Sequence, residues 1–145
     1  IYTSSYTYVY RDDNVTSICN KYNPEIDTIL YDALNEIDIF LSKNKLNEEL
    51  KNSRDIAVIN FLFIIMKLKI FNLNNKEKLI KKINELENIC FKFGVYDILN
   101  RNLINVGKTR KFLLKLLKNK RYLILYICFN LKMKLDKWGV KNYEK

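Results

Sequence analysis

Residues that break secondary structure are scarce in this chain, whose 145 residues include three glycines and one proline. A β-sandwich or barrel requires a turn after every short strand, and turns draw on these two residues above most others. The scarcity therefore favours a small number of long helices. Hydrophobic residues make up 48% of the sequence, which is enough apolar material for one domain of this length to bury a core.

Apolar residues after the first 22 positions recur at steps of three and four, the spacing of one helix face. Residues 23–25, Asn-Pro-Glu, predict a helix start, because asparagine caps well and proline suits the first turn. This helix is expected to reach Leu41 and to carry an acidic outer face. Residues 46–51 predict a short helical turn. Residues 55–71 are apolar nearly all round and predict a helix buried between neighbours, with a strand over 56–65 as the alternative.

Residues 76–93 show the clearest amphipathic pattern, and Gly94 stands where a helix C-cap belongs. A further helix is predicted over 95–106. The stripe of the 76–93 helix that we expect to be buried consists of Leu79, Ile80, Ile83, Leu86, Cys90 and Phe93.

Two more helices are predicted in the last third of the chain. The first, over residues 108–118, places lysines on one face and leucines on the other. A joint at Asn119-Lys120 separates it from the second, over residues 121–137, which Gly139 is expected to end. The apolar stripe expected on this last helix consists of Ile124, Cys128, Leu131, Leu135 and Trp138.

The predicted fold class is all-α, with about six helices in a bundle or a short stack of helical hairpins that spans residues 23–145 as one domain. Residues 1–22 lack helical periodicity and predict an extended arm, or alternatively a short edge strand. Side chains alternate in an extended segment, so the tyrosines of the arm share one face. We interpret these tyrosines as residues that dock on a partner: Tyr2, Tyr6, Tyr8 and Tyr10.

Positive charge is concentrated at the C-terminal end. Residues 1–100 hold 13 Lys and Arg against 14 Asp and Glu, a net of −1, whereas residues 101–145 hold 13 against 2, a net of +11. The abundance of Lys, Asn and Ile is typical of an A/T-rich genome, but a codon bias of that kind would spread the lysines evenly. A one-sided positive field attracts polyanions such as nucleic acid or an acidic surface.

Clustered lysines and arginines neutralise phosphates, and aromatic rings among them can stack on unpaired bases. Tyr122, Tyr126 and Trp138 are interleaved with the basic residues, and the last two fall near the apolar stripe and fit the core better. The sequence therefore predicts a nucleic-acid-binding surface that consists of Arg101, Lys108, Arg110, Lys111, Lys115, Lys118, Lys120, Arg121, Lys132, Lys134, Lys137 and Lys141.

Several kinds of chemistry lack their usual residues in this sequence. There is no histidine, and the three scattered cysteines lack the spacing of metal ligands. The triplet Gly107-Lys108-Thr109 lacks the upstream glycine of a phosphate-binding loop, because position 102 is Asn. No apolar stretch reaches the roughly 20 residues of a membrane span. We expect a protein that is not an enzyme, uses no cofactor or metal, and has no transmembrane span.

The segment "DIAVINFLFIIMKLKIFNLNNKEKLIKKINELENICFKFG", residues 55–94, resembles the helical-hairpin repeats of organellar RNA-binding proteins of the pentatricopeptide or octotricopeptide kind. In those repeats a helix that ends in "KL" and a short polar joint precedes a second amphipathic helix. The resemblance covers about a quarter of the chain. It implies RNA binding in a mitochondrion or plastid, often within a ribosome, and a cleaved leader would explain why no methionine precedes Ile1.

The sequence thus suggests a non-enzymatic, ribosome-associated component of a mitochondrial ribonucleoprotein. We expect it to bind RNA through its C-terminal third and neighbouring proteins through its tyrosine arm. Two alternatives stay open. The chain is an accessory subunit of a large mitochondrial membrane complex, in which the basic face meets acidic lipid or protein. Or it is a secreted or viral helical-bundle effector that binds a host protein.

Overall fold

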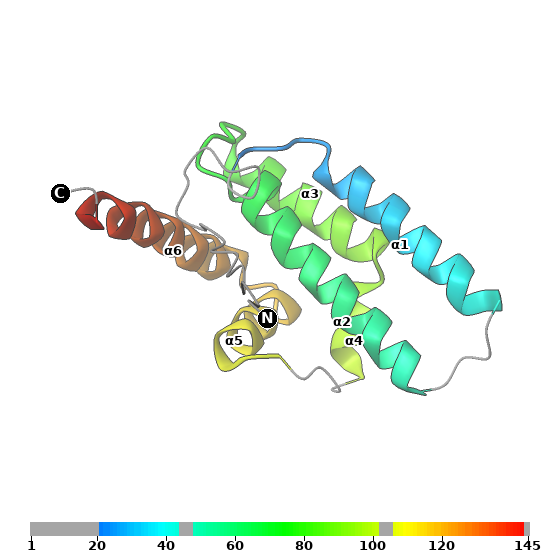
Figure 1. Ribbon diagram of the computed structural model, residues 1–145. Coiled ribbons are helices and arrows are strands. Elements are labelled where there is room, and N and C mark those ends of the chain that lie inside the picture. The colour runs from blue at the N-terminus through cyan, green and yellow to red at the C-terminus, as the bar shows by residue number, and fades with distance from the viewer. Residues whose placement is uncertain (1–20, 44–47, 102–105, 144–145) are drawn as a thin grey trace, which may run out of the picture.

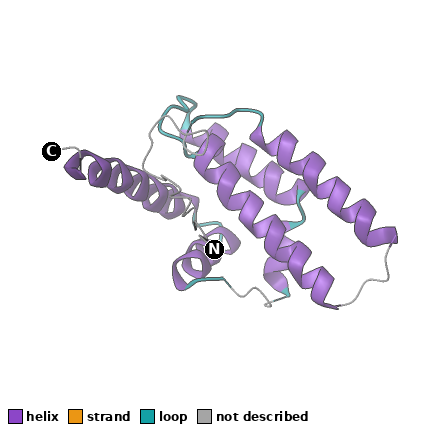
Figure 2. Cartoon of the chain, viewed as in Figure 1, coloured by secondary structure: helices purple, strands orange, loops and turns teal. Residues whose placement is uncertain are grey.

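The computed structural model describes residues 21–43, 48–101 and 106–143, with side chains described as far as Leu135 (Figure 1). These residues form six α-helices and one π-helical segment and include no strand, as Figure 2 shows, so the predicted all-α class is confirmed. The tyrosine arm, with Tyr2, Tyr6, Tyr8 and Tyr10, lies outside the described residues. The elements are α1 (Ile26–Lys43), α2 (Glu48–Ile65), η1 (Met66–Ile70), α3 (Leu79–Lys92), α4 (Val95–Asn100), α5 (Lys108–Lys118) and α6 (Tyr122–Tyr143).

Helix α1 begins where the sequence predicts. The Oδ1 atom of Asn23 accepts a hydrogen bond from the backbone N–H of Glu25 at 3.0 Å, which satisfies one of the donors that a helix start leaves unpaired. Leu34 and Leu41 on the inner face are buried. The opposite face carries exposed carboxylates, as expected for the acidic outer face.

Helix α2 is one continuous helix from Glu48, so the separate turn predicted over residues 46–51 is wrong within the described residues. The apolar segment is helical throughout, which excludes the strand alternative. Val58, Ile59, Leu62 and Ile65 are fully buried, as predicted for a helix between neighbours. The helix continues into η1, where the N–H of Phe71 donates to the carbonyl of Met66, five residues earlier, at 2.9 Å.

Two buried asparagines close the end of η1, at the predicted polar break. The Asn72 side-chain amide donates to the carbonyl of Lys67 at 3.2 Å, and that of Asn75 donates to Lys69 at 2.8 Å and to Ile70 at 3.3 Å. These bonds satisfy carbonyls that a helix end otherwise leaves without donors. The loop that contains these asparagines extends to residue 78. Helix α3 therefore begins at Leu79 rather than at the predicted residue 76.

Helix α3 buries part of its predicted stripe. Leu86, Cys90 and Phe93 are buried, but Ile80 is 71% exposed and faces solvent, whereas Lys82 in the same turn is buried. Gly94 caps the helix with a φ of +64°, in the left-handed region that favours glycine, so that prediction is confirmed. Helix α4 ends at Asn100, earlier than the predicted residue 106.

Helices α5 and α6 form a hairpin around the predicted joint, where Lys120 has a φ of +54°. The prediction that Gly139 ends α6 is wrong, since the helix continues to Tyr143. Glycine weakens a helix by about 1 kcal/mol but does not forbid it. The prediction that Ile124, Leu131 and Leu135 lie on the buried face of α6 is also wrong, because all three are exposed. The buried residues of α6 are instead Tyr122, Leu125 and Phe129.

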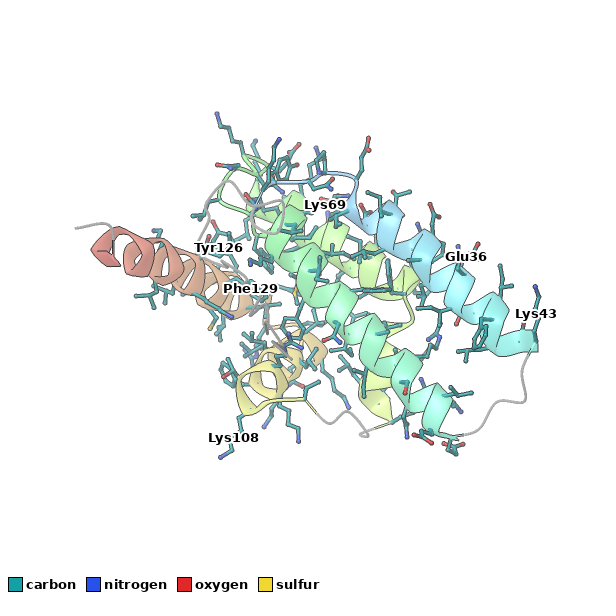
Figure 3. The ribbon with its side chains drawn as sticks, in the orientation of Figure 1. Glu36, Lys43, Lys69, Lys108, Tyr126 and Phe129 are labelled. Carbon is teal, nitrogen blue, oxygen red and sulfur yellow. The ribbon has the colours of Figure 1, made fainter. Side chains whose placement is uncertain are left out.

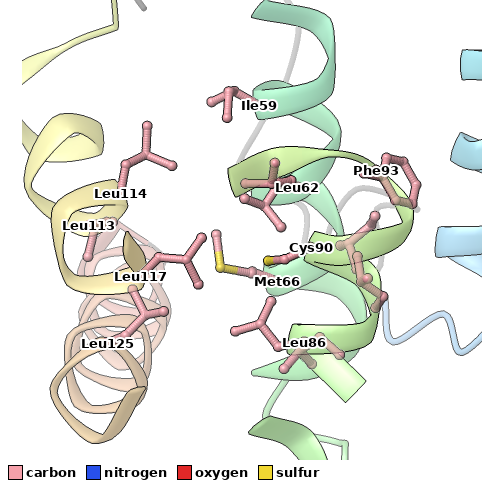
Figure 4. Packing of buried hydrophobic residues seen from close by; sticks show 14 of the residues in the cluster. Ile59, Leu62, Met66, Leu86, Cys90, Phe93, Leu113, Leu114, Leu117 and Leu125 are labelled. Atoms are coloured by element: carbon pink, nitrogen blue, oxygen red, sulfur yellow. The ribbon is translucent and has the colours of Figure 1, made fainter. Parts of the chain in front are cut away.

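One core joins all these helices. Figure 4 shows the leucines of α5 and α6 facing Leu62, Met66 and Leu86. The rings of Phe71 and Phe129 lie 5.3 Å apart, centroid to centroid, and connect the end of η1 to α6. We refer below to residues 21–101 as the body and to residues 106–143, which contain α5 and α6, as the basic hairpin.

Candidate nucleic-acid interface

Helix α5 separates its charged and apolar residues cleanly. Leu113, Leu114 and Leu117 are buried against the body, whereas the lysines on the other side are exposed. The arrangement follows from the helical period, since steps of three and four residues return to the same face. The exposed lysines of this face are Lys108, Lys111, Lys115 and Lys118. Figure 3 shows Lys108 pointing away from the molecule.

Carboxylates of the same chain leave most of this charge uncompensated. Residues 106–135 contain nine basic residues and no acidic residue. Among the described residues, the ion pair made by this segment joins Lys120 to Glu87 at 3.6 Å, and the two side chains are 70% and 39% exposed. An exposed pair of this kind contributes about 0–1 kcal/mol. The basic hairpin therefore presents a positive surface to solvent.

Three of the predicted binding residues are instead engaged with the body. Arg101 donates to both carboxylate oxygens of Asp55 at 3.0 and 2.8 Å. Arg110 donates to the Oδ1 atom of Asn60 at 2.7 Å, and Lys118 donates to a backbone carbonyl of α4 at 3.2 Å. The contact of Arg101 holds the end of α4 against α2. The contacts of Arg110 and Lys118 hold α5 against α2 and α4.

The remaining predicted residues fall into two groups. Lys108, Lys111 and Lys115 lie together on α5, and their ammonium groups make no ion pair within the described residues. The others are spread along the joint and α6, where Arg121, Lys132 and Lys134 are exposed. Lys137 and Lys141 lie in the last part of α6, beyond the described side chains.

An exposed aromatic ring lies beside the lysines of α5 and was missed by the sequence analysis. Phe112 is 52% exposed, and helical spacing places it next to Lys108 and Lys115. The signal was present, because residues 108, 112 and 115 follow one another at steps of four and three. The prediction left Phe112 out because it directly precedes the leucines that line the apolar face.

Two of the aromatic residues that the sequence offered for base stacking, Tyr122 and Tyr126, pack inside the fold, and the third, Trp138, lies beyond the described side chains. The hydroxyl of Tyr122 donates to Glu87 at 2.6 Å and lies 3.1 Å from the hydroxyl of Tyr96. Burial, followed by the bond to Glu87, raises the pKa of Tyr122. Tyr126 packs edge-on against Phe71 at 5.8 Å, so the expectation that it belongs to the core is confirmed.

A polar groove of about 500 Å³ lies at the other end of the body. Its carboxylates Asp38 and Asp55 are both paired with arginines, the first with Arg54 at 2.7 Å and the second with Arg101 at 2.8 Å. These ion pairs in the groove join α1 to α2 and the end of α4 to α2. No group of three or more potential metal ligands gathers anywhere among the described side chains. None of the described helices is sufficiently long and apolar to cross a lipid bilayer.

Comparisons of the chain with protein-family profiles, with curated proteins and with solved structures found no match.

Proposed function

We propose that this protein is a non-enzymatic RNA-binding protein, and that the exposed face of α5 is its contact surface. The observation that carries the proposal is the uncompensated row of Lys108, Lys111 and Lys115, with Phe112 beside it. Ammonium groups neutralise backbone phosphates without reading sequence, and an aromatic ring stacks on any unpaired base.

Single-stranded or looped RNA fits this surface better than a duplex. Residues 108–118 extend over about 15 Å of helix, and the ring of Phe112 can stack only on a base that is not already stacked between neighbours. The rows of leucines behind the lysines fix α5 against the body, so the charges are held on a rigid element. The favoured ligand is therefore an RNA segment with unpaired bases.

We place the protein in an organellar, specifically mitochondrial, ribonucleoprotein on the basis of the resemblance described above. Residues 55–94 fold as the helical pair α2–η1 and α3, which agrees with a hairpin unit. The location in the mitochondrial matrix and the association with a ribosome depend on the resemblance alone. Crosslinking of the tagged protein in cells with ultraviolet light, followed by sequencing of the bound RNA, tests them directly.

Binding of a fluorescent single-stranded RNA across a series of salt concentrations tests the surface itself. For the triple variant Lys108→Gln, Lys111→Gln, Lys115→Gln we expect weaker binding, and a slope of log K against log salt that is flatter by about 2, since each lost phosphate contact removes about 0.7. Lys118 is left intact because it also holds α4. Phe112→Ala should cost about 1–3 kcal/mol of binding with the salt slope unchanged.

The matched control is Lys51→Gln, Lys76→Gln, Lys78→Gln, which removes the same charge from exposed lysines of the body. This control should bind RNA nearly as well as the unmodified protein. Equal losses for the two triple variants would mean that net charge alone attracts RNA, and would overturn the proposal. So would binding to anionic lipid vesicles that depends on the α5 lysines while RNA binding does not.

A further inference from the structure

The side of α6 that faces away from the core is apolar. Leu123, Ile124, Ile127, Leu131 and Leu135 are 45–66% exposed, whereas Tyr122, Leu125 and Phe129 on the opposite side are buried. Ile124, Ile127 and Leu131 follow one another at steps of three and four, which makes a continuous ridge along the helix. A helix with two apolar faces normally lies between two layers of structure, and here the second layer is absent from the described residues.

The charges along this ridge limit what can cover it. Lys134 lies on the same face by helical register, Lys120 precedes the ridge, and Lys132 and Arg121 are exposed beside it. Pairing of two α6 helices would bring these like charges together, which is unfavourable. An RNA strand would meet the charges but leave the bulky aliphatic side chains without apolar contacts. The ridge therefore suits a surface that is both apolar and acidic.

The outer face of α1 has that composition. Ile29 and Ile39 are 54% and 46% exposed there, and the acidic residues on the same stripe are Glu25, Asp32 and Glu36. Positions 25, 29, 32, 36 and 39 follow one another at steps of four and three, so they form one row. These three carboxylates are exposed and make no ion pair within the described residues, unlike Asp27 and Asp38 on the inner side.

We propose that the outer face of α6 in one copy of this chain packs against the outer face of α1 in a second copy. The two rows are similar in length, since Ile124–Leu135 and Ile29–Ile39 each extend over about 15 Å of helix. The charges are opposite, with lysines at the ends of one row and carboxylates within the other. Figure 1 shows α1 and α6 at opposite sides of the molecule, so one chain cannot pair its own two faces.

An interface between two different faces is heterologous, and each added copy leaves one free α1 face and one free α6 face. The copies therefore assemble head to tail into an open row or a closed ring. Each copy carries the exposed lysines of α5, so such a row would repeat the RNA-binding surface proposed above at regular intervals. The inference itself does not depend on RNA binding.

Sedimentation velocity of the full chain tests the proposal with two blocked variants. Ile127→Glu with Leu131→Glu disables the α6 face, and Ile29→Lys with Glu36→Lys disables the α1 face. The unmodified protein should form oligomers that dissociate as salt is raised, whereas each blocked variant alone should be a monomer. An equal mixture of the two variants should yield a dimer and nothing larger, because one variant keeps the α1 face and the other keeps the α6 face.

The control variant, Ile80→Glu with Phe91→Glu, replaces exposed apolar residues of α3 and should assemble like the unmodified protein. Circular dichroism checks that every variant retains its helix content. The proposal is overturned by an unmodified protein that stays monomeric at its highest soluble concentration. It is also overturned by assembly that survives the α1 substitutions, or by blocked variants that do not pair when mixed.

Discussion

The body and the basic hairpin use their charges in opposite ways. In the body, Lys69 bridges Asp27 at 2.7 Å and Glu85 at 2.9 Å, which ties η1 to α1 and α3. Arg54 pairs with Asp38 across α1 and α2 at 2.7 Å. In the basic hairpin the described side chains include no carboxylate at all, and the lysines of α5 face solvent. Ion pairs thus connect helices within the body, whereas the hairpin presents its positive charge to solvent.

The two regions also differ in how they treat apolar surface. Most apolar residues of α2 and η1 are buried or half-buried, and the exposed ones, Ile56 and Ile64, are only 37% and 39% exposed. Helix α6 encloses one apolar side and exposes the other. The inner side of the hairpin therefore belongs to the fold, whereas its outer side is available for contacts with other molecules.

The largest expected effect concerns these two sides of α6. Leu125→Ala should lower the free energy of unfolding by about 2–5 kcal/mol, because Leu125 is fully buried and its removal leaves a cavity. The same substitution at Leu131, which is 57% exposed, should change it by no more than about 0.5 kcal/mol in the monomer. Urea unfolding measures both. Equal losses would show that the outer side of α6 is covered within the chain.

The next effect concerns the ion pairs of the body. Lys69→Met should lower the free energy of unfolding by about 1.5–3 kcal/mol, because it leaves Asp27 and Glu85 partly buried without their cation. Lys134→Met on the hairpin is the control and should stay within about 0.5 kcal/mol. Equal losses of stability in the two variants would contradict the conclusion that cations stabilise the body but not the hairpin.

The pH dependence of this contribution follows from the pKa of Lys69. Burial alone lowers that pKa, but the hydrogen bonds to Asp27 and Glu85 outweigh burial and leave it raised. A base with a raised pKa contributes its full stability below its unfolded value, about 10.4, and loses it as the pH rises further. The difference between Lys69→Met and the unmodified protein should therefore be constant from neutral pH to about pH 10.

A smaller effect tests the junction between the two regions. Burial raises the pKa of the Cys90 thiol to about 12, and the thiol lies in a chain of hydrogen bonds with Tyr96 and, through it, Tyr122 of α6. An acid with a raised pKa is stabilising below its unfolded value and loses that contribution above it. Between about pH 9 and pH 12, stability should fall by about 1.4 kcal/mol per pH unit on account of this group.

Urea unfolding of the unmodified protein and of Cys90→Val at pH 8 and pH 10 measures that slope. The variant should lose less stability over this interval. Identical slopes would mean that water reaches Cys90, and hence that the hairpin separates from the body in solution.

Much of the fold could be predicted from local rules. The cap at Asn23, the left-handed turn at Gly94 and the joint at Asn119-Lys120 depend on residues within a few positions of one another. The separation of lysines from leucines on α5 follows from a single helical period. These features succeeded because near neighbours in the chain determine them.

The candidate site was predicted less completely. The sequence placed twelve cations in one surface, but Arg101 and Arg110 lie against α2, because their partners Asp55 and Asn60 are distant in the chain and close in space. Phe112 was left out of the predicted surface, although its spacing from Lys108 and Lys115 places it beside them. The two arginines are separated from their partners by 46 and by 50 positions in the chain, and no short sequence pattern encodes a contact over such a distance.

The sequence by itself determined that the chain is helical, that its basic residues are collected at one end, and where most helices start or stop. Only the tertiary structure decided which of the two apolar sides of α6 is buried. Each side has helical spacing, and the choice depends on which one matches the surface of Phe63, Phe71 and their neighbours. Packing between distant segments, rather than periodicity, makes that selection.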